Sequence, residues 1–250
     1  MAIYIGLGFY FKLNTESYLL LGIPLTTIFQ LFVAKQPIYK LWLRDQQKFH
    51  LNKLAWTITS IFILYPIYKL TIDFIGGYRA PERIGFDLAM LLGAFAAGFC
   101  YSNFTKKTAR DFLVCFAITF LLRMSLYFLP FIAGRSLFNP DYLRGLKSLL
   151  TYIPVAFVVE EVIFRGMLDT YIQPDKNPSR IFTALFISLL WGLWHLPLSD
   201  DNHSVWFAAA GSMVVSLWGI ILSIFWRRTG NLAVPGFSHA FADAIRDSLK

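Results

Sequence analysis

The chain has 250 residues, of which 56% are hydrophobic and only 15% are charged, whereas an ordinary soluble domain is roughly 45–50% apolar and about 25% charged. This composition excludes a soluble globular enzyme, and it also excludes a disordered, collagen-like or coiled-coil chain. The net charge of +8 does not indicate nucleic-acid binding, because the lysines and arginines lie between hydrophobic runs and form no soluble basic face.

Runs of about 17–25 mostly apolar residues are long enough to cross the core of a bilayer as helices. Eight such runs predict an all-α, polytopic membrane bundle with about eight transmembrane helices and short connections, which favours one compact membrane domain. The expected spans are residues 18–34, 54–72, 86–104, 111–133, 148–168, 181–199, 205–226 and 231–246. The last run is short and is interrupted by Pro235 and Gly236.

Two segments outside these spans are expected at the membrane surface. Residues 2–11 are apolar but too short to span, and they lack the basic region and the cleavage site of a removable signal peptide. Residues 35–53 carry five basic residues interleaved with large apolar ones, a pattern that fits a basic amphipathic interfacial helix. A solvated basic loop is an equally good interpretation of the second segment.

The distribution of Lys and Arg predicts how the bundle is oriented. Twelve of these residues lie in one set of alternate connections, against seven in the opposite set. The richer set comprises residues 35–53, 105–110, 169–180 and 227–230. Because basic connections stay on the cytoplasmic side, we expect this end to face the cytoplasm. A multi-pass protein of a bacterial plasma membrane fits the short loops, while an organelle or endoplasmic-reticulum membrane stays open.

Charged residues are rare inside the expected spans, and each costs at least about 2.5–3.5 kcal/mol at the centre of a bilayer. Glu160 and Glu161 lie about 17 Å along a helix that begins near residue 149, at mid-membrane depth. Glu161 and Arg165 are four residues apart, so they share a helix face and can pair. Glu160 is rotated by about 100° from Glu161 and lacks that partner, which suits it to act as a general base or acid.

Two further spans contribute groups that can hold or move protons. His195 ends an apolar run, and His239 and Asp243 are four residues apart on one helix face. Burial of these groups on three separate spans is favourable only if they converge on a wet cavity. Arg123, about 18 Å into its own span, is expected to be the partner of a carboxylate or an inward structural charge rather than a catalytic residue.

Several known hydrolase and redox arrangements are excluded by inspection. The chain contains no His-Glu-x-x-His zinc motif and no Gly-x-Gly-Asp motif, and after the adjacent His239 no histidine follows Ser238 that could act as its base. Cys100 and Cys115 show no metal or disulfide spacing and are expected to be small core residues. Two carboxylates and two histidines can still bind a metal, relay protons or activate water.

Three motifs in register resemble the CPBP (ABI) family. They are Glu160-Glu161-x-x-x-Arg165, Trp191-x-x-x-His195 and His239-x-x-x-Asp243. This family includes the type II CAAX prenyl endopeptidases and bacterial bacteriocin-processing and immunity-type membrane proteins. The resemblance covers residues 148–247, so we interpret residues 1–147 as N-terminal membrane helices with a basic interfacial segment. It implies a hydrolase, an intramembrane protease whose partners are the lipid bilayer and a lipidated (CAAX-like) or membrane-embedded peptide substrate.

The resemblance also implies roles for individual residues. Glu160 and His195 would activate the attacking water, and Glu161 and Arg165, in the same motif as Glu160, are counted with them among the catalytic residues. His239 and the residue at 243 would stabilise the oxyanion. Asp243 departs from the family, because CAAX-type members usually have Asn there, and an ionised carboxylate cannot donate a hydrogen bond.

Three roles therefore stay open for Asp243. It would be protonated, it would orient His239, or it would join His195 and His239 as a metal ligand. A metalloendopeptidase with a divalent metal such as zinc, held by Glu160, His195 and His239, and a metal-free glutamate mechanism are both compatible with the residues. The sequence favours the metal-free mechanism slightly, and no cofactor is assigned with certainty.

Two other classes of function compete with the protease. A non-catalytic immunity or scaffold protein of the same family would use the same polar cluster for structure. A proton-coupled transporter would use buried Glu and His as a relay, although the sequence has no broken-helix repeats of the kind found in many transporters.

Overall fold

The computed structural model describes residues 1–78, 80–132, 134, 140–175, 177–198 and 205–249, and of residues 129, 130 and 205–216 it describes the backbone alone. Within this part of the chain every regular element is helical, as the sequence predicts. The α-helices are α1 (Ala2–Tyr10), α2 (Thr15–Ile28), α3 (Lys53–Phe62), α4 (Leu64–Ile75), α5 (Pro81–Phe99), α6 (Lys106–Ile132), α7 (Tyr142–Val155), α8 (Thr170–Ile172), α9 (Ile181–Trp194), α10 (Val205–Thr229) and α11 (Ala233–Ser248). Shorter 3-10 or π-helical segments are η1 (Phe29–Val33), η2 (Ile38–Leu41), η3 (Cys100–Asn103), η4 (Ala156–Glu160), η5 (Val162–Asp169) and η6 (Leu196–Leu198).

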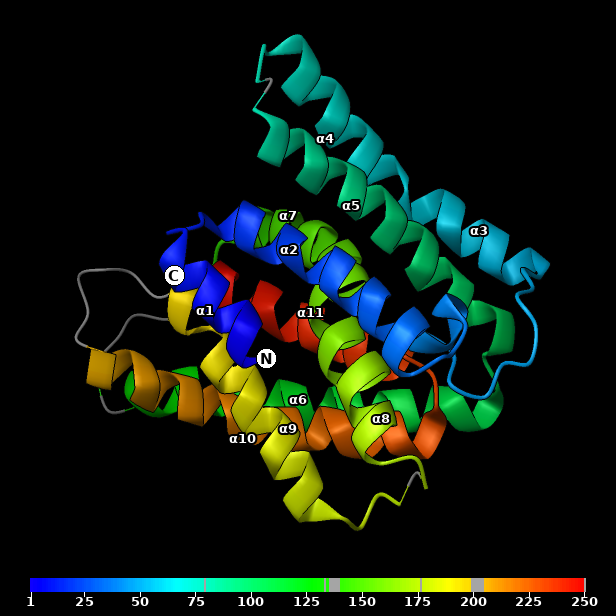
Figure 1. Ribbon diagram of the computed structural model, residues 1–250. Helices are drawn as coiled ribbons and strands as arrows, with labels where there is room; N and C mark the ends of the chain where they lie inside the picture. The colour runs from blue at the N-terminus through cyan, green and yellow to red at the C-terminus, as the bar shows by residue number, and fades with distance from the viewer. Residues whose placement is uncertain (79, 133, 135–139, 176, 199–204, 250) are drawn as a thin grey trace.

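One nearly continuous helix, made of α7, η4, η5 and α8, runs through the middle of the bundle (Figure 1). In its middle part, large apolar side chains such as Phe157 and Phe164 are fully buried. Helices α2 and α5 pack against η4, α11 packs along α7, and the α9–α10 pair packs against η5. Helices α3 and α4 lie along α5 at the outer side of the bundle (Figure 1). The central helix is therefore enclosed by elements from both halves of the chain.

Five helices within the described residues are long and apolar enough to cross a membrane. They are Thr15–Val33, Lys53–Ile75, Pro81–Asn103, Lys106–Phe128 and Ile181–Leu198. Each matches one expected span, which confirms an all-α integral membrane protein. The other three spans are not confirmed: the central helix carries several charges, α11 has only 16 residues, and most side chains of α10 are not described. Residues 133 and 199, expected at the ends of two spans, lie outside the described residues.

The segment between α2 and α3 differs from both of its expected forms. After η1, residues 35–52 contain only the four-residue η2, so the prediction of an amphipathic helix is wrong. It is not a solvated loop either, because Leu41 and Leu43 are each 2% exposed. The indole Nε1 of Trp42 donates to the carbonyl of Phe157 over 2.6 Å. A Cβ at Gly166 would collide with the carbonyl oxygen of Leu41, so the absence of a side chain there lets this segment lie directly on the central helix.

The four connections that hold most of the basic residues lie at one end of the bundle. The amide of Arg44 donates to the carbonyl of Gly230 over 2.8 Å, and its guanidinium donates to the carbonyl of Gln173 over 2.6 Å. One cavity is lined jointly by Asp45, Lys107 and residues 228–231. This common location is what alternate connections of a membrane bundle require.

The expected surface segment at the N-terminus forms α1. Tyr4 in α1 is 4% exposed, and its hydroxyl donates to the carbonyl of Tyr18 over 2.8 Å. The helix thus packs against α2 through a buried tyrosine, and its position at the membrane interface stays a prediction.

Candidate active site

The candidate carboxylates lie where the central helix changes its winding. Pro154 near the end of α7 has no N–H and cannot donate within the helix. Two residues later the π-helical η4 begins, and it ends at Glu160. Such widened turns occur mostly at functional sites. Glu161 separates η4 from η5, and Arg165 follows in the first turn of η5.

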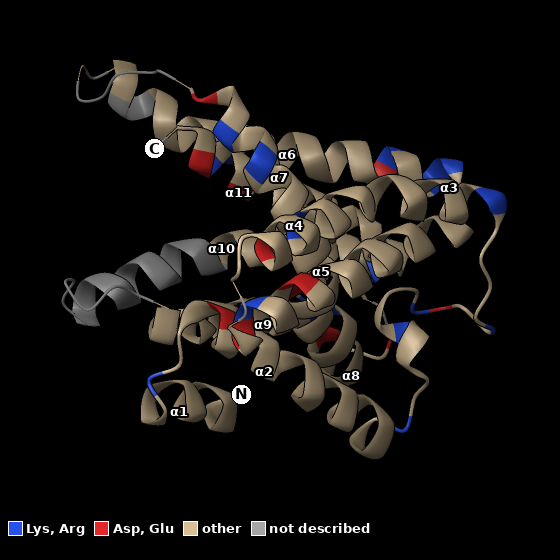
Figure 2. Ribbon diagram, turned by 90° about the horizontal axis from the view of Figure 1, so that it is seen from above, with Lys and Arg blue, Asp and Glu red and all other residues tan. Residues whose placement is uncertain are grey.

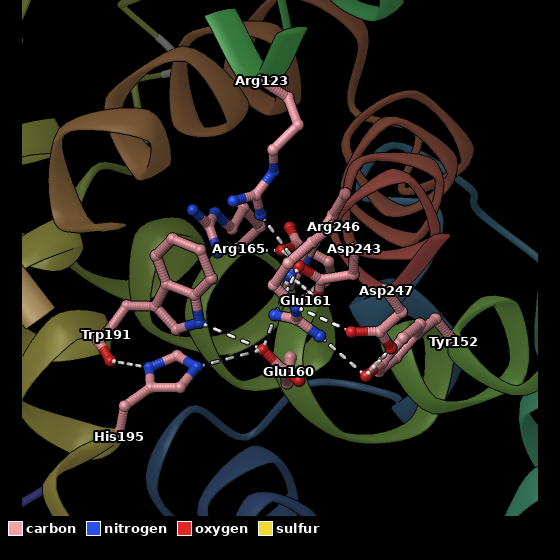
Figure 3. Close-up of polar contacts among 11 residues, drawn as sticks. Arg123, Tyr152, Glu160, Glu161, Arg165, Trp191, His195, Asp243, Arg246 and Asp247 are labelled. Carbon is pink, nitrogen blue, oxygen red and sulfur yellow. Dashed lines mark hydrogen bonds and ion pairs between the residues drawn. The ribbon is translucent and has the colours of Figure 1, made fainter. Parts of the chain in front are cut away.

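All six residues singled out in the sequence come together in space (Figure 3). Glu161 accepts from Arg165 over 2.9 Å, as the spacing of four predicts, and both side chains are fully buried. The same Glu161 oxygen lies 2.8 Å from Nδ1 of His239 in α11. Nε2 of His239 lies 3.2 Å from Asp243. The convergence of three separate helices, inferred from the energy of burying charge, is observed.

Glu160 and His195 face each other across a gap. Oε2 of Glu160 lies 3.8 Å from Nε2 of His195 and accepts from Nε1 of Trp191 over 3.2 Å. Nδ1 of His195 lies 2.8 Å from the carbonyl of Trp191. Because a carbonyl only accepts, Nδ1 carries the proton, so in the neutral ring Nε2 presents its lone pair towards Glu160. The separation is too long for a direct hydrogen bond, and a water molecule can contact both atoms.

His239 is held differently, with a carboxylate at each ring nitrogen. Glu161 lies at Nδ1 and Asp243 at Nε2, and Nε2 is also 3.7 Å from Glu160. Ionised carboxylates only accept, so the ring satisfies both contacts as an imidazolium with two N–H donors. His239 is 3% exposed. It is therefore a fixed cationic group beside Glu160, unlike the half-buried His195.

Asp243 is clamped by two arginines (Figure 3). Arg123 from α6 contacts the Oδ1 atom over 3.1 Å, and Arg246, one helical turn further along α11, contacts the same atom over 3.0 Å. Arg123 also lies over the ring of Trp218, with 4.5 Å between the guanidinium carbon and the ring centroid. The expectation that Arg123 is the partner of a carboxylate is confirmed. These two cationic partners favour the ionised form of the Asp243 carboxylate.

Sequence reasoning missed three residues that support this clamp. Arg246 donates to the hydroxyl of Tyr152 over 2.7 Å, and Tyr152 donates to Asp247 over 2.9 Å. Arg246 also contacts Asp247 over 3.0 Å. The i, i+3 spacing of Asp243 and Arg246 was a usable signal, but nothing in the sequence indicated that Tyr152, 94 residues away, closes the network.

A cavity of about 420 Å³ reaches Glu160 from the side of α2 and α5. Leu19, Phe86 and Val155 provide apolar walls, and Tyr152 and Lys147 line its course along α7. Of the six candidate residues, Glu160 alone lines this cavity. The cavity therefore supplies a route to the carboxylate of Glu160 but not to the buried Glu161–Arg165 pair.

The residues do not fit a bound divalent metal. Within the described part of the chain no group of three or more His, Cys, Asp or Glu side chains is arranged as a metal site. Both ring nitrogens of His239 face carboxylates, and Asp243 is already neutralised by two arginines. A metal ligand must present a free lone pair, and neighbouring cations oppose a dication.

A comparison with known protein families gives a match over the part of the chain that holds the candidate residues. Residues 143–245 match the family described as Type II CAAX prenyl endopeptidase Rce1-like. This part of the chain is similar to the Rce1-like domains of the CPBP family. The resemblance seen in the three motifs is confirmed, and the family supports a protease in general terms. No curated protein and no solved structure matches the chain.

The Rce1-like domain begins within α7 and ends within α11, so it holds all six candidate residues. Two residues of the clamp lie outside it, because Arg123 precedes the domain and Arg246 follows its last matched residue. The domain therefore depends on α6 to complete the surroundings of Asp243.

Proposed function

We propose that this protein is an intramembrane endopeptidase that hydrolyses a peptide bond in a lipidated, CAAX-like or membrane-associated peptide. The observation that carries the proposal is the pair formed by Glu160 and His195. Their side chains are 12% and 31% exposed, and they are the two most accessible of the six candidates. They face each other at a separation that a water molecule can bridge, within a domain whose family comprises CAAX endopeptidases.

In the proposed reaction Glu160 is the general base. It takes one proton from a water molecule held between its Oε2 atom and Nε2 of His195, and the water oxygen attacks the peptide carbonyl carbon. The proton then passes from Glu160 to the nitrogen of the departing amine as the C–N bond breaks. The products are a carboxyl group and a free amine, so atoms and charge balance without any further reactant.

The negative charge that develops on the carbonyl oxygen needs a positive group that is already in place. The imidazolium of His239 is suited to this role through its charge, since its Nε2 lies 3.7 Å from the base while its two N–H groups stay on Glu161 and Asp243. Asp243 then orients His239 instead of donating to the oxyanion itself. The two arginines support this assignment, because they favour the ionised carboxylate.

The cavity beside Glu160 supports a substrate that comes from the membrane. An extended peptide segment can approach the carboxylate between α2, α5 and α7 along the apolar side chains of Leu19, Phe86 and Val155. A lipid attached to the peptide can stay in the surrounding bilayer.

Cleavage of a labelled prenylated CAAX peptide by the purified full chain in detergent tests the proposal, with an unprenylated peptide alongside. We expect Glu160→Gln and His195→Ala to lower the rate by about 10²–10⁴. We expect Glu82→Gln, a carboxylate change in α5 away from the site, to leave the rate unchanged, and a chelator to have no effect.

Two outcomes would contradict the proposal. If the Glu160→Gln variant cleaves at the wild-type rate, Glu160 is not the general base and the proposed mechanism is wrong. If neither peptide is cleaved and Glu160→Ala keeps the phenotype of the wild-type protein in cells, the immunity or scaffold function is correct. Loss of cleavage on chelation would instead assign the chemistry to a metal.

A further inference from the structure

Another polar cavity lies at the basic end of the bundle, far along the central helix from the candidate active site. Its volume is about 270 Å³, and its polar lining comes from η1, the segment after it, and α8. The residues that matter for the argument are Gln30, Gln36, Lys40, Arg44, Thr170 and Tyr171. The proposed peptidase chemistry uses none of them.

The two cations of this cavity are not matched by carboxylates. Lys40 donates to the amide oxygen of Gln36 over 2.9 Å, and Arg44 donates to the carbonyl of Gln173 over 2.6 Å. Neither residue is in an ion pair within the part of the chain that the structure describes. Arg44 is only 7% exposed, and its second terminal nitrogen is buried without a hydrogen-bond partner. Burial lowers the pKa of Arg44 below its usual range.

Asp45, the neighbour of Arg44 in the chain, acts on its charge, but two other acidic residues nearby have arginine partners of their own. Asp169 contacts Arg227 over 2.7 Å, with both side chains fully buried. Asp175 contacts Arg180 over 3.0 Å. Neither Lys40 nor Arg44 has a carboxylate in direct contact among the described residues, and the buried guanidinium, with one nitrogen unpartnered, is costly unless an anion accompanies it.

The position of the cavity indicates what kind of anion this is. The candidate span Thr15–Val33 ends next to it, and the last residues of that span, Leu31, Phe32 and Val33, are exposed and apolar. Tyr171 stands exposed at the rim, as tyrosines do at the level of lipid headgroups. Basic segments run along the connection from α2 to α3 (Figure 2), at the end predicted to face the anionic cytoplasmic leaflet.

We propose that this cavity binds the phosphate of an anionic phospholipid headgroup, held by Lys40 and Arg44, while the acyl chains lie against the exposed apolar end of η1. Lys40 supplies a mobile ammonium at the entrance, and Arg44 supplies a fixed guanidinium deeper inside. Through Leu41, which lies between them on Gly166, an occupied cavity would stabilise the packing of this segment on the central helix.

Native mass spectrometry of the detergent-purified full chain tests the proposal. Retention of one phosphatidylglycerol molecule is measured against phosphatidylcholine, which has no net charge. We expect Lys40→Gln and Arg44→Gln each to weaken retention of phosphatidylglycerol about fivefold. Lys48→Gln makes the same charge change at an exposed position of the same segment, outside the cavity, and is expected to leave retention unchanged.

Three outcomes decide the matter. Equal losses in Lys40→Gln and Lys48→Gln would mean a diffuse surface charge and would overturn the site. Equal retention of the two lipids by the wild-type chain would overturn recognition of an anionic headgroup. Displacement of the lipid by millimolar inorganic phosphate would identify free phosphate as the ligand of the same residues. Because Arg44 is buried, a loss of lipid in Arg44→Gln counts only if the unfolding midpoint of this variant is unchanged. Lys40→Gln tests the site without that condition.

Discussion

Replacement of Asp243 by Asn separates two roles that the residue could have. Asn is the residue usual at this position in CAAX-type members, and it is nearly the same size as Asp. If residue 243 served as an oxyanion donor, the replacement would keep activity and stability. If the ionised carboxylate holds His239 in place, as we propose, the replacement removes the charge on which three contacts depend.

The expected loss follows from those contacts. His239, Arg123 and Arg246 lie 3.2, 3.1 and 3.0 Å from Asp243, and the Asp243 side chain is 10% exposed. A hydrogen bond to an ionised group is stronger than a neutral one by about 1 kcal/mol. Three such bonds amount to roughly 3 kcal/mol of unfolding free energy, which lowers the unfolding midpoint of a chain of this size by roughly 6–12 °C.

The chain carries its own probe for this measurement. Cys100 and Cys115 are both free and fully buried, so a thiol-reactive dye reports unfolding in detergent. Glu82→Gln, which also neutralises one carboxylate, serves as control and is expected to shift the midpoint by less than about 2 °C. A midpoint for Asp243→Asn within about 2 °C of wild type, together with undiminished cleavage, would refute the orienting role.

Two further replacements test the packing of the central helix by the same unfolding measurement. Arg165→Met leaves Glu161 without one of its two cationic partners in a fully buried site, and we expect a loss of about 3–5 kcal/mol. The exposed pair Arg180–Asp175 is the control, since Arg180→Met should cost about 1 kcal/mol or less. Equal losses in the two variants would contradict the distinction. Gly93→Ala places a Cβ against the backbone carbonyl of Pro154 where α5 meets α7, and we expect a loss of about 1–3 kcal/mol. Gly6→Ala in α1 meets open space and should be neutral or stabilising, as Ala normally is in a helix. A stabilised Gly93→Ala variant would show that α5 and α7 do not approach each other so closely.

The length of apolar runs predicted the helices well, because a span must satisfy its backbone internally whatever surrounds it. The number of spans was harder to predict. Ile63 separates α3 from α4 within one expected span, and the central helix combines span-like length with the charges of the site. Hydropathy alone does not distinguish a helix that contacts lipid from one that is enclosed by other helices, as the central helix is.

The segment between α2 and α3 shows where pattern reasoning fails. Alternating basic and apolar residues predict an amphipathic helix only if lipid covers the apolar side. Here protein covers it, since Trp42 donates to the carbonyl of Phe157 and Leu43 pairs with Asn231 in an isolated bridge. Both partners lie more than a hundred residues further along the chain, beyond the reach of local periodicity.

The contacts of the candidate site also fall into those that local spacing predicted and those that it did not. Spacing by four residues predicted the contacts of Glu161 with Arg165 and of His239 with Asp243, which are confirmed. The meeting of Glu160 with His195 could be inferred only from the energy of burying charge and from the family resemblance, because no local pattern joins two helices. Sequence gave no indication that Arg123 and Arg246 would share one oxygen of Asp243.

These two arginines explain how an aspartate can occupy position 243. A carboxylate there, close to Glu160 and Glu161, would concentrate negative charge in a buried site, which is unfavourable unless cations balance it. Arg123 and Arg246 supply that balance, and both lie outside the matched residues 143–245. The departure from Asn is therefore a property of the whole bundle and not of one motif. The double replacement Arg123→Gln and Arg246→Gln should be tolerated better with Asn at position 243 than with Asp, which a comparison of unfolding midpoints in the two backgrounds decides.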